Sequence, residues 1–539
     1  MNSITKRMSV VLIIVVLLSV FNVPGIFAGE KTSAKNVILL IPDGMSLDGT
    51  SLARWYKVAP LAMDEMACGL VRTYSSDAAI ADSAPAGTAF ATGYKSHTGY
   101  IGVLPDVANM PGLKPIAEGD EKRPVANVLE AARLAGKSTG IISTSEIQHA
   151  TPAAFSAHYP DRKNYDWLGE QQVYSGVDVV LGGGHKFLAT EGRKDGEDLL
   201  KEIIRLGYDY VTTPGEMKKS KSGKLWGMFA PADLSYEMDR DSSKQPSLSE
   251  MTAKAIEVLS RDKDGFFLMV EGSKIDWAAH ANDPMGIISD ILAFDDAVKV
   301  ALDFAKKDKN TVVIAVSDHG NGGISIGDRG TTKSYDKEPL ETFIGPLKKA
   351  RVTGEGLELL LDKDRTNIKY VMSTYFGIND LTDEETAAIK SAKAGSMNYT
   401  VGPIISKRAY IGWTTGGHTG EEVVLYVYSP GSGRPTGVIE NTDVANYMEK
   451  VLGLDLKKTT EQLFVPAEKA FSGKGASVEI DNSDSNNPVL VVKKGADTIK
   501  LPVNKNYALV NEKAVKMNGF TVYNGVSFYV PDEAVKLVK

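Results

Sequence analysis

Cysteine is almost absent from this 539-residue sequence, which contains Cys68 alone and only seven histidines. A single cysteine excludes an intramolecular disulfide and any zinc site built from several thiolates. The few histidines mean that a metal site in this chain must also use carboxylates. We interpret Cys68 as a small buried hydrophobe, the commonest role of an unpaired cysteine.

Excess positive charge is also missing, because 61 Lys and Arg face 68 Asp and Glu, for a formal net charge of −7. This balance argues against a nucleic-acid-binding module, since phosphate backbones would be repelled. With 43% hydrophobic and 24% charged residues, the composition is that of a globular protein. The length predicts a large core with at least one additional module.

The N-terminus resembles a secretory signal peptide. Lys6 and Arg7 precede an apolar run at 8–21, a helix-breaking segment at 22–25 and the small-residue cleavage pattern Ile26-Phe27-Ala28. We therefore predict a signal peptide at 1–28 and a secreted or extracytoplasmic protein. An uncleaved anchor is the alternative, because the uncharged stretch 8–29 is just long enough to span a bilayer.

Short apolar runs rich in β-branched residues alternate with helix-like segments along most of the chain. Runs that are apolar on both faces are typical of buried parallel strands, and their alternation with helices indicates an α/β fold. We predict a central, mostly parallel sheet flanked by helices, with strands at 36–41, 138–143, 177–181, 266–270, 311–317 and 423–429. The flanking helices are expected at 124–134, 248–261 and 288–306.

Two regions depart from this alternation. Strand signal is weak between 317 and 423, where helices are expected at 348–362 and 382–392, so we predict an insertion at about 328–410. A glycine- and serine-rich stretch at 472–487 is expected to be a linker. Beyond it, residues 488–539 alternate apolar and polar side chains, with a hairpin signal at Asn524-Gly525. This region is predicted to be a small β-rich C-terminal domain.

Acidic residues and histidines follow several of the predicted strands. In open α/β sheets, ligands bind beyond the carboxyl ends of the strands. One such aspartate is often only a helix N-cap, but several at neighbouring strand ends indicate a site. The residues in question are Asp43, Glu271, Asp318 and His319, with His418 just before the last strand.

Asp276 and His280 add a further pair, four residues apart, which on a helix places both side chains on one face. An ordinary ion pair is the simplest interpretation of such spacing taken alone. Beside the other acids and histidines, a pair of metal ligands is favoured. Mixed carboxylate and histidine sites suit Zn²⁺, and an oxygen-only site suits Mg²⁺.

Ser83 begins a stretch of small residues that is expected to be helical. As an N-cap, its hydroxyl would need no further role. As a nucleophile, it would benefit from the positive end of the helix and from a nearby metal, both of which favour the alkoxide. Its own sequence neighbourhood leaves both interpretations open.

Together, these motifs resemble the metal-dependent alkaline phosphatases over residues 35–471, the expected catalytic domain. The resemblance is carried by Pro42-Asp43-Gly44, Asp82-Ser83-Ala84, His149-Ala150-Thr151-Pro152 with Arg162, Glu271-Gly272 through Asp276 and His280, Asp318-His319-Gly320, and Gly417-His418-Thr419-Gly420. Each motif is weak alone, but the ordered set is specific.

The resemblance implies a role for each matching residue. One Zn²⁺ would be held by Asp276, His280 and His418; a second by Asp43, Asp318 and His319; and one Mg²⁺ by Asp43, Thr151 and Glu271. Ser83 would be the nucleophile that forms a phosphoserine. Arg162, oriented by Asp82, would bind two phosphate oxygens as only a planar guanidinium can. The expected reaction is hydrolysis of phosphate monoesters, and family members are often homodimers.

Two positions vary within the family. His149 stands where the best-studied bacterial form has Asp, which is expected to weaken the Mg²⁺ site. Trp277 stands where other members have Lys or His near the phosphate. Losing that cation is expected to weaken phosphate retention, to speed product release and to raise the KM for phosphate esters.

The C-terminal domain weakly resembles the copper-amine-oxidase N-terminal-like domains of exported proteins from Gram-positive bacteria. This implies attachment to the cell envelope; a packing subdomain without a partner is the alternative. For the whole chain, two other functions stay open: a phosphodiesterase or another member of the same superfamily, and an inactive surface binding protein on this scaffold.

Overall fold

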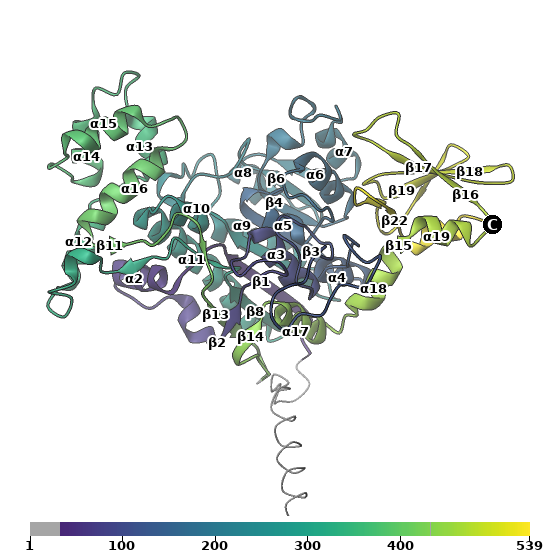
Figure 1. The fold of residues 1–539 in the computed structure, drawn as a ribbon, viewed down its shortest axis with the longest axis horizontal. Coiled ribbons are helices and arrows are strands. Elements are labelled where there is room, and N and C mark those ends of the chain that lie inside the picture. The colour runs from purple at the N-terminus through teal and green to yellow at the C-terminus, as the bar shows by residue number, and fades with distance from the viewer. Residues whose placement is uncertain (1–32, 432) are drawn as a thin grey trace, which may run out of the picture.

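The computed structural model describes residues 33–431 and 433–539, so the predicted signal peptide at 1–28 lies outside the described residues. Figure 1 shows a central sheet between layers of helices, with a helical lobe at one end and yellow β-sheets at the other. No helix within the described part of the chain is long and apolar enough to cross a membrane.

The central sheet has ten strands in the order β14-β2-β13-β8-β1-β7-β3-β4-β6-β5. Most neighbours are parallel, whereas β13 runs antiparallel to both β8 and β2. The predicted α/β fold with a mostly parallel sheet is confirmed. Its strands are β1 (Asn36–Pro42), β2 (Ala67–Arg72), β3 (Ser138–Glu146), β4 (Val179–Gly183), β5 (Asp209–Val211), β6 (Leu225–Met228), β7 (Phe266–Gly272), β8 (Thr311–Val316), β13 (Val423–Tyr428) and β14 (Gly437–Glu440).

The central strand β1 shows why helices cover both faces of this sheet. Its side chains are buried on both sides: Ile38 and Leu40 join one hydrophobic cluster, whereas Val37, Leu39 and Ile41 join the other. Successive side chains of a strand point to opposite faces, so each face needs its own cover. The first cluster includes residues from α2 (Leu47–Lys57), α9 (Leu248–Leu259) and α11 (Pro284–Asp308), and the second includes residues from α3 (Ser83–Thr92), α4 (Val128–Leu134) and α17 (Thr442–Leu452).

Shorter elements connect these layers. They include α5 (Ala150–Ala154), α6 (Tyr165–Tyr174), α7 (Leu199–Arg205), α8 (Pro214–Lys219), α10 (Lys274–His280) and the short strands β9 (Gly320–Asn321), β10 (Ser325–Ile326), β11 (Ile411–Gly412) and β12 (His418–Thr419). The strands β2, β5, β6 and β14 were not predicted. β5, β6 and β14 are only three or four residues long, and β5 and β14 lie at the edges of the sheet. β2 is only partly buried. The apolar patterns of these four strands are therefore weak.

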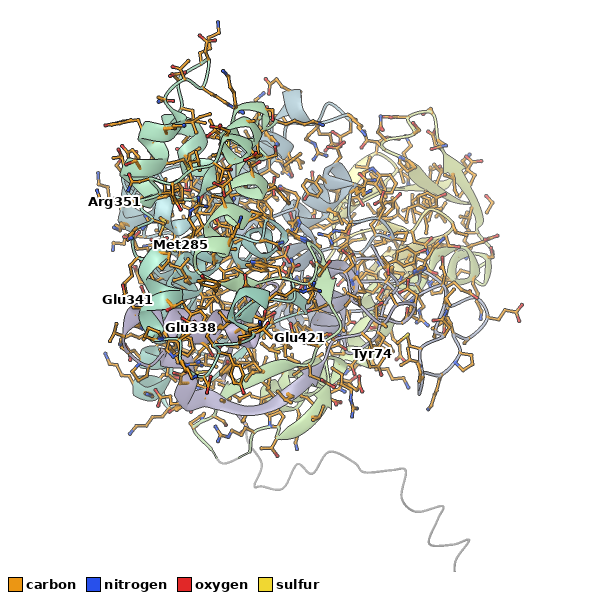
Figure 2. The ribbon with its side chains drawn as sticks, turned by 60° about the vertical axis from the view of Figure 1, so that its left-hand side comes forward. Tyr74, Met285, Glu338, Glu341, Arg351 and Glu421 are labelled. Atoms are coloured by element: carbon orange, nitrogen blue, oxygen red, sulfur yellow. The ribbon has the colours of Figure 1, made fainter. Side chains whose placement is uncertain are left out.

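The region between β8 and β13 contains a lobe of helices, as the weak strand signal indicated. It comprises α12 (Leu340–Leu347), α13 (Gly354–Leu360), α14 (Ile368–Phe376), α15 (Asp383–Ser391) and α16 (Met397–Arg408). Figure 2 shows Glu338, Glu341 and Arg351 on this side of the molecule, opposite the C-terminal β-sheets.

The C-terminal sheets contain a strand where the sequence predicted a linker. Strand β16 (Ser477–Asp481) lies within 472–487 and pairs antiparallel with β17 (Val489–Lys494). Its polar side chains are exposed, which is why its pattern resembles a loop. The five-stranded sheet continues with β18 (Asp497–Pro502), β19 (Tyr507–Val510) and β20 (Lys513–Lys516).

A second, three-stranded sheet pairs one strand that precedes the five-stranded sheet with two strands that follow it. Strand β15 (Val465–Pro466) pairs with β22 (Phe528–Val530), which pairs with β21 (Val522–Tyr523) through a loop at Asn524-Gly525. The predicted hairpin is present, and Gly525 has a φ of 87° that suits glycine. Helices α18 (Leu456–Leu463), α19 (Ala467–Ser472) and α20 (Asp532–Lys536) complete this region.

Candidate functional site

The candidate site lies where adjacent strands of the central sheet end. β1 is flanked by β8 and β7, and all three run parallel, so their carboxyl ends meet at one edge. Asp43 follows β1, Glu271 lies near the end of β7, and Asp318 and His319 follow β8. The structure therefore brings together residues that are up to 276 positions apart in the sequence (His319 and Asp43, 319 − 43).

Asp276, His280 and His418 lie together at one end of this site. However, the ligand group found there joins Asp276 and His418 with His319, and the ligand atoms of that group all lie within 4.8 Å of one another. Helix α10 places Asp276 Oδ2 3.4 Å from His280 Nε2, and β12 brings His418 Nε2 to within 3.5 Å of Asp276 Oδ1. The two histidine Nε2 atoms are 3.2 Å apart. Asn321 Nδ2 donates to Asp276 Oδ1 at 2.6 Å and fixes the carboxylate from β9.

Asp43, Asp318 and His319 form a second group, with ligand atoms that lie within 4.8 Å of one another. All three side chains are fully buried. The Ser83 hydroxyl lies 3.1 Å from His319 Nε2 at the edge of this group. Gly44 keeps the groups together, because its φ is 69° and a Cβ there would lie 2.7 Å from Asp276 Oδ1.

A third group contains Asp43, His149 and Glu271. Thr151, at the start of α5, donates to Asp43 Oδ2 at 3.5 Å, and Ser143 donates to Glu271 Oε2 at 2.5 Å. Sequence reasoning assigned Asp43, Thr151 and Glu271 to one ion and placed His149 outside that set of ligands. The structure adds the His149 ring to the group.

The third group is short of positive charge. Burial, followed by repulsion from Asp318, Asp276 and Glu271, raises the pKa of Asp43 well above its ordinary value. Burial raises the pKa of Glu271 to about 7. A cation bound between these carboxylates removes both penalties, so the site fits metal ions.

Unpartnered atoms within the described residues support the same interpretation. In the third group, Asp43 Oδ1 and Glu271 Oε1 are buried and have no hydrogen-bond partner there. Buried polar atoms are nearly always bonded, and two unbonded carboxylate oxygens in one group indicate a missing cation. Oxygen and imidazole nitrogen are suitable donors for Mg²⁺ and Zn²⁺.

Ser83 is the first residue of α3, and Asp82 is the N-cap. The interpretation of Ser83 as an N-cap is therefore wrong: Asp82 occupies that position, although its carboxylate does not bond to the helix backbone. Asp82 instead accepts hydrogen bonds from Gly99 N at 3.1 Å and from Arg162 Nη1. Ser83 is buried, and its hydroxyl is left to face His319.

Arg162 lies beside the same serine helix and is held from two sides. Besides Asp82, it contacts His149 Nε2 through Nη2 at 3.0 Å. Since an arginine can only donate, His149 accepts with Nε2. Burial, together with the Arg162 charge, lowers the pKa of His149 to about 3 and keeps the ring neutral.

Trp277 borders the site from α10. Its ring packs edge-on against His149, with ring centroids 5.9 Å apart, and Lys274 Nζ lies 4.4 Å from its centroid. Lys274 is fully buried and pairs with Asp233. A cation is therefore present next to Trp277, although its ammonium is bound to a carboxylate.

Several supporting residues were not found from the sequence. Asn321 fixes Asp276, and Glu421 Oε1 accepts from Ser46 Oγ at 2.6 Å and Thr419 Oγ1 at 3.0 Å, tying the loop after β1 to β12. Glu421, labelled in Figure 2, directly follows the Gly417–Gly420 motif. Asn321 lies two residues after His319, and Glu421 lies three residues after His418. This nearness to a predicted ligand is the sequence signal that could have identified them.

Residues 34–454 match the family model for alkaline phosphatase. The chain belongs to the alkaline phosphatase family. The predicted resemblance is thus confirmed, and so is the prediction of an enzyme of this family. The family is metal-dependent, in agreement with the three groups of ligand side chains.

Curated alkaline phosphatases match this chain over most of their own length. The chain is 40% identical to alkaline phosphatase 4 of Bacillus subtilis (strain 168) over 465 residues, which cover 79% of this chain and 94% of the relative. It is 35% identical to the repressible alkaline phosphatase of Saccharomyces cerevisiae (strain ATCC 204508 / S288c), with coverages of 81% and 85%.

Solved structures and a second family model agree. The fold superposes on Thermus thermophilus alkaline phosphatase with a TM-score of 0.69 and 30% identity, covering 78% of this chain and 92% of that one. Residues 455–537 match the copper amine oxidase N-terminal domain, which confirms the resemblance of the C-terminal region. That match begins at α18, earlier than the predicted domain at 488–539.

Proposed function

We propose that this alkaline phosphatase family member hydrolyses phosphate monoesters through a phosphoserine on Ser83. The observation that carries the proposal is the position of the Ser83 hydroxyl. It lies at the N-terminus of α3, 3.1 Å from His319 Nε2, beside a pocket of carboxylates and next to Arg162. The helix N-terminus and cations held by the carboxylates would stabilise an alkoxide, and the Arg162 guanidinium attracts a phosphate.

The proposal includes two zinc ions and one magnesium ion. Asp276, His280 and His418 would hold one Zn²⁺; Asp43, Asp318 and His319 the second; and Asp43, Thr151 and Glu271 the Mg²⁺, with His149 beside it. When bound, such ions supply Lewis acidity that favours ionised oxygen nucleophiles and leaving groups.

The chain's own residues would then perform two displacements. Ser83 Oγ forms a bond to phosphorus as the ester P–O bond breaks, and the alcohol departs with a proton. Water then bonds to the same phosphorus, the Oγ–P bond breaks, and inorganic phosphate leaves while Ser83 recovers its proton. In both steps Arg162 donates to two phosphate oxygens, held in place by Asp82 and His149.

Acid-quenched enzyme tests the proposal directly. Mass spectrometry of enzyme stopped in acid with a phosphate monoester is expected to find phosphate on Ser83, and Ser83→Ala should show none. Rates on p-nitrophenyl phosphate, its bis-ester and its sulfate analogue test the substrate class. A preference for the diester or the sulfate would refute a monoesterase, and no turnover in added Zn²⁺ and Mg²⁺ would indicate a binding protein.

We also propose that the enzyme acts outside the cytoplasm and that its C-terminal domain contributes to attachment at the cell envelope. The motif at 1–28 and the match of the C-terminal region to the copper amine oxidase N-terminal domain support this. Cell fractionation is the test, with N-terminal sequencing of the extracellular protein. A mature chain starting near residue 29 is expected, and an intact N-terminus in the cytosol would refute export. Sedimentation would separately test the homodimer expected from the family.

A further inference from the structure

A groove of about 1130 Å³ runs between the phosphatase core and the C-terminal domain. Its lining includes His149 and Arg162, the guanidinium assigned above to phosphate binding. It also includes Ile480, Asn486 and Tyr523 of the C-terminal domain. When Arg162 binds the phosphate of an ester, the alcohol part of that ester can therefore lie against the C-terminal domain.

The lining of this groove combines aromatic rings, side-chain amides and charged side chains, the last from Asp161, Lys163, Asp166, Lys194 and Asp195. Tyr165 packs edge-on against Phe187, with ring centroids 4.7 Å apart, and both line the core side. Tyr523 supplies a ring from the C-terminal domain. Amides come from both sides as well, with Asn164 on the core and Asn482 and Asn486 on the C-terminal domain. Aromatic faces pack against flat rings, while amides donate to and accept from hydroxyls.

The two walls are fixed to each other rather than merely adjacent. Trp167 Nε1 donates to the Asn486 carbonyl at 2.9 Å, and its ring lies 6.3 Å from that of Tyr523. Lys505 is buried and pairs with Glu170 and Glu197, and Asn504 Nδ2 donates to Glu170 Oε2 at 2.8 Å. Trp167 and Glu170 belong to α6, which begins three residues after Arg162, so one helix positions both the groove and the guanidinium.

We infer that this groove is a leaving-group subsite for phosphate monoesters of polyhydroxylated ring compounds, namely sugar or nucleoside phosphates. The inference rests on the proposed monoesterase function and assigns part of the substrate specificity to the C-terminal domain. Tyr523 and Ile480 are specificity residues in this arrangement, because they line the groove from the C-terminal domain and belong to none of the groups assigned to phosphate or metal binding.

The test compares three primary alkyl esters: methyl phosphate, a hexose 6-phosphate and a nucleoside 5′-phosphate. Their reacting bonds are alike, but methanol offers neither a ring nor further hydroxyls for the groove to bind. The full-length enzyme is expected to show at least a tenfold higher kcat/KM for one or both ring-bearing esters, a ratio equivalent to about 1.4 kcal/mol. The two ring-bearing arms distinguish a sugar subsite from a nucleoside subsite.

Tyr523→Ala is expected to lower kcat/KM for the preferred ester about tenfold and to leave methyl phosphate within twofold. Ile480→Ala, at a half-exposed position on the same wall, should act in the same direction by about threefold without disturbing the fold. Tyr335→Ala is the matched control, because Tyr335 is exposed in the helical insertion and does not line the groove.

Three results would overturn the inference: equal kcat/KM for all three esters, no effect of either groove variant, or an equal loss on methyl phosphate in both. Failure of the monoesterase proposal has a different signature, since methyl phosphate itself would then not be hydrolysed by the unmodified enzyme.

Discussion

His280 Nε2 and His418 Nε2 face each other at 3.2 Å, although each ring has its Nδ1 within 2.8 Å of a backbone carbonyl, at Gly416 and Ala81 respectively. A carbonyl only accepts, so both rings donate from Nδ1, and in neutral rings both Nε2 atoms carry lone pairs. Two lone pairs opposed beside the Asp276 carboxylate repel each other unless a proton or a metal ion lies between them, and pairing with Asp276 outweighs burial and raises the pKa of His280 to about 9. The hydrogen bonds to the backbone hold these rings in the orientation that ligates metal.

Chelation should therefore cost stability as well as activity. Without a cation, the buried carboxylates of Asp43, Glu271 and Asp318 repel one another. Metal present at about 100 times its Kd contributes about 2.7 kcal/mol to folding. Calorimetry in EDTA is expected to show a lower Tm that added Zn²⁺ restores, and an unchanged Tm would contradict the metal assignment.

Asp283→Asn should stabilise the enzyme at alkaline pH. Asp283 caps α11 by accepting from Met285 N at 2.9 Å, and burial raises the pKa of its carboxyl to about 7. A raised acid pKa gives stability that is fully present below the ordinary aspartate pKa of about 4 and is lost as pH rises to about 7. Asparagine keeps the cap without the buried charge. The gain should be larger at pH 8 than at pH 5 by about 3 kcal/mol in urea unfolding, and an equal effect at both would refute it.

Lys505→Met should loosen the C-terminal domain from the core. The substitution leaves the fully buried Glu170 carboxylate without its ammonium, and breaking a buried pair costs about 3–5 kcal/mol. Limited proteolysis is expected to release the domain faster, with part of the stability recovered in Lys505→Met/Glu170→Gln. The matched control is Lys500→Met, whose exposed pair with Glu512 is worth below about 1 kcal/mol. Equal proteolysis of the two single variants would show that the buried pair does not anchor the domain.

Trp277→Lys should tighten inhibition by inorganic phosphate. A lysine there adds a cation close to the His149 ring, which contacts Arg162. We expect the inhibition constant to fall about tenfold, equivalent to about 1.4 kcal/mol, and product release to slow. Trp277→Met separates loss of the ring from gain of the charge. If both variants show the same inhibition constant, the charge at this position has no part in phosphate retention.

Local sequence patterns by themselves determined much of this protein. Continuous apolar runs specified the buried strands, as in β1 and β7, because burial on both faces requires them. The four-residue spacing of Asp276 and His280 predicted one helix face, and α10 provides it. Ligand types and their positions after strands were also readable, since the carboxyl ends of parallel strands meet at one edge.

Tertiary structure alone decided the relationships between distant segments. Strand order and the entry of His149 into the third group depend on contacts that no local pattern encodes. The same holds for β16, whose exposed polar strand is defined only by its partner β17. The groove lies between two domains that are joined by the ion pair of Lys505 with Glu170, 335 positions apart in the sequence. Such a pair depends on how the folded domains fit together.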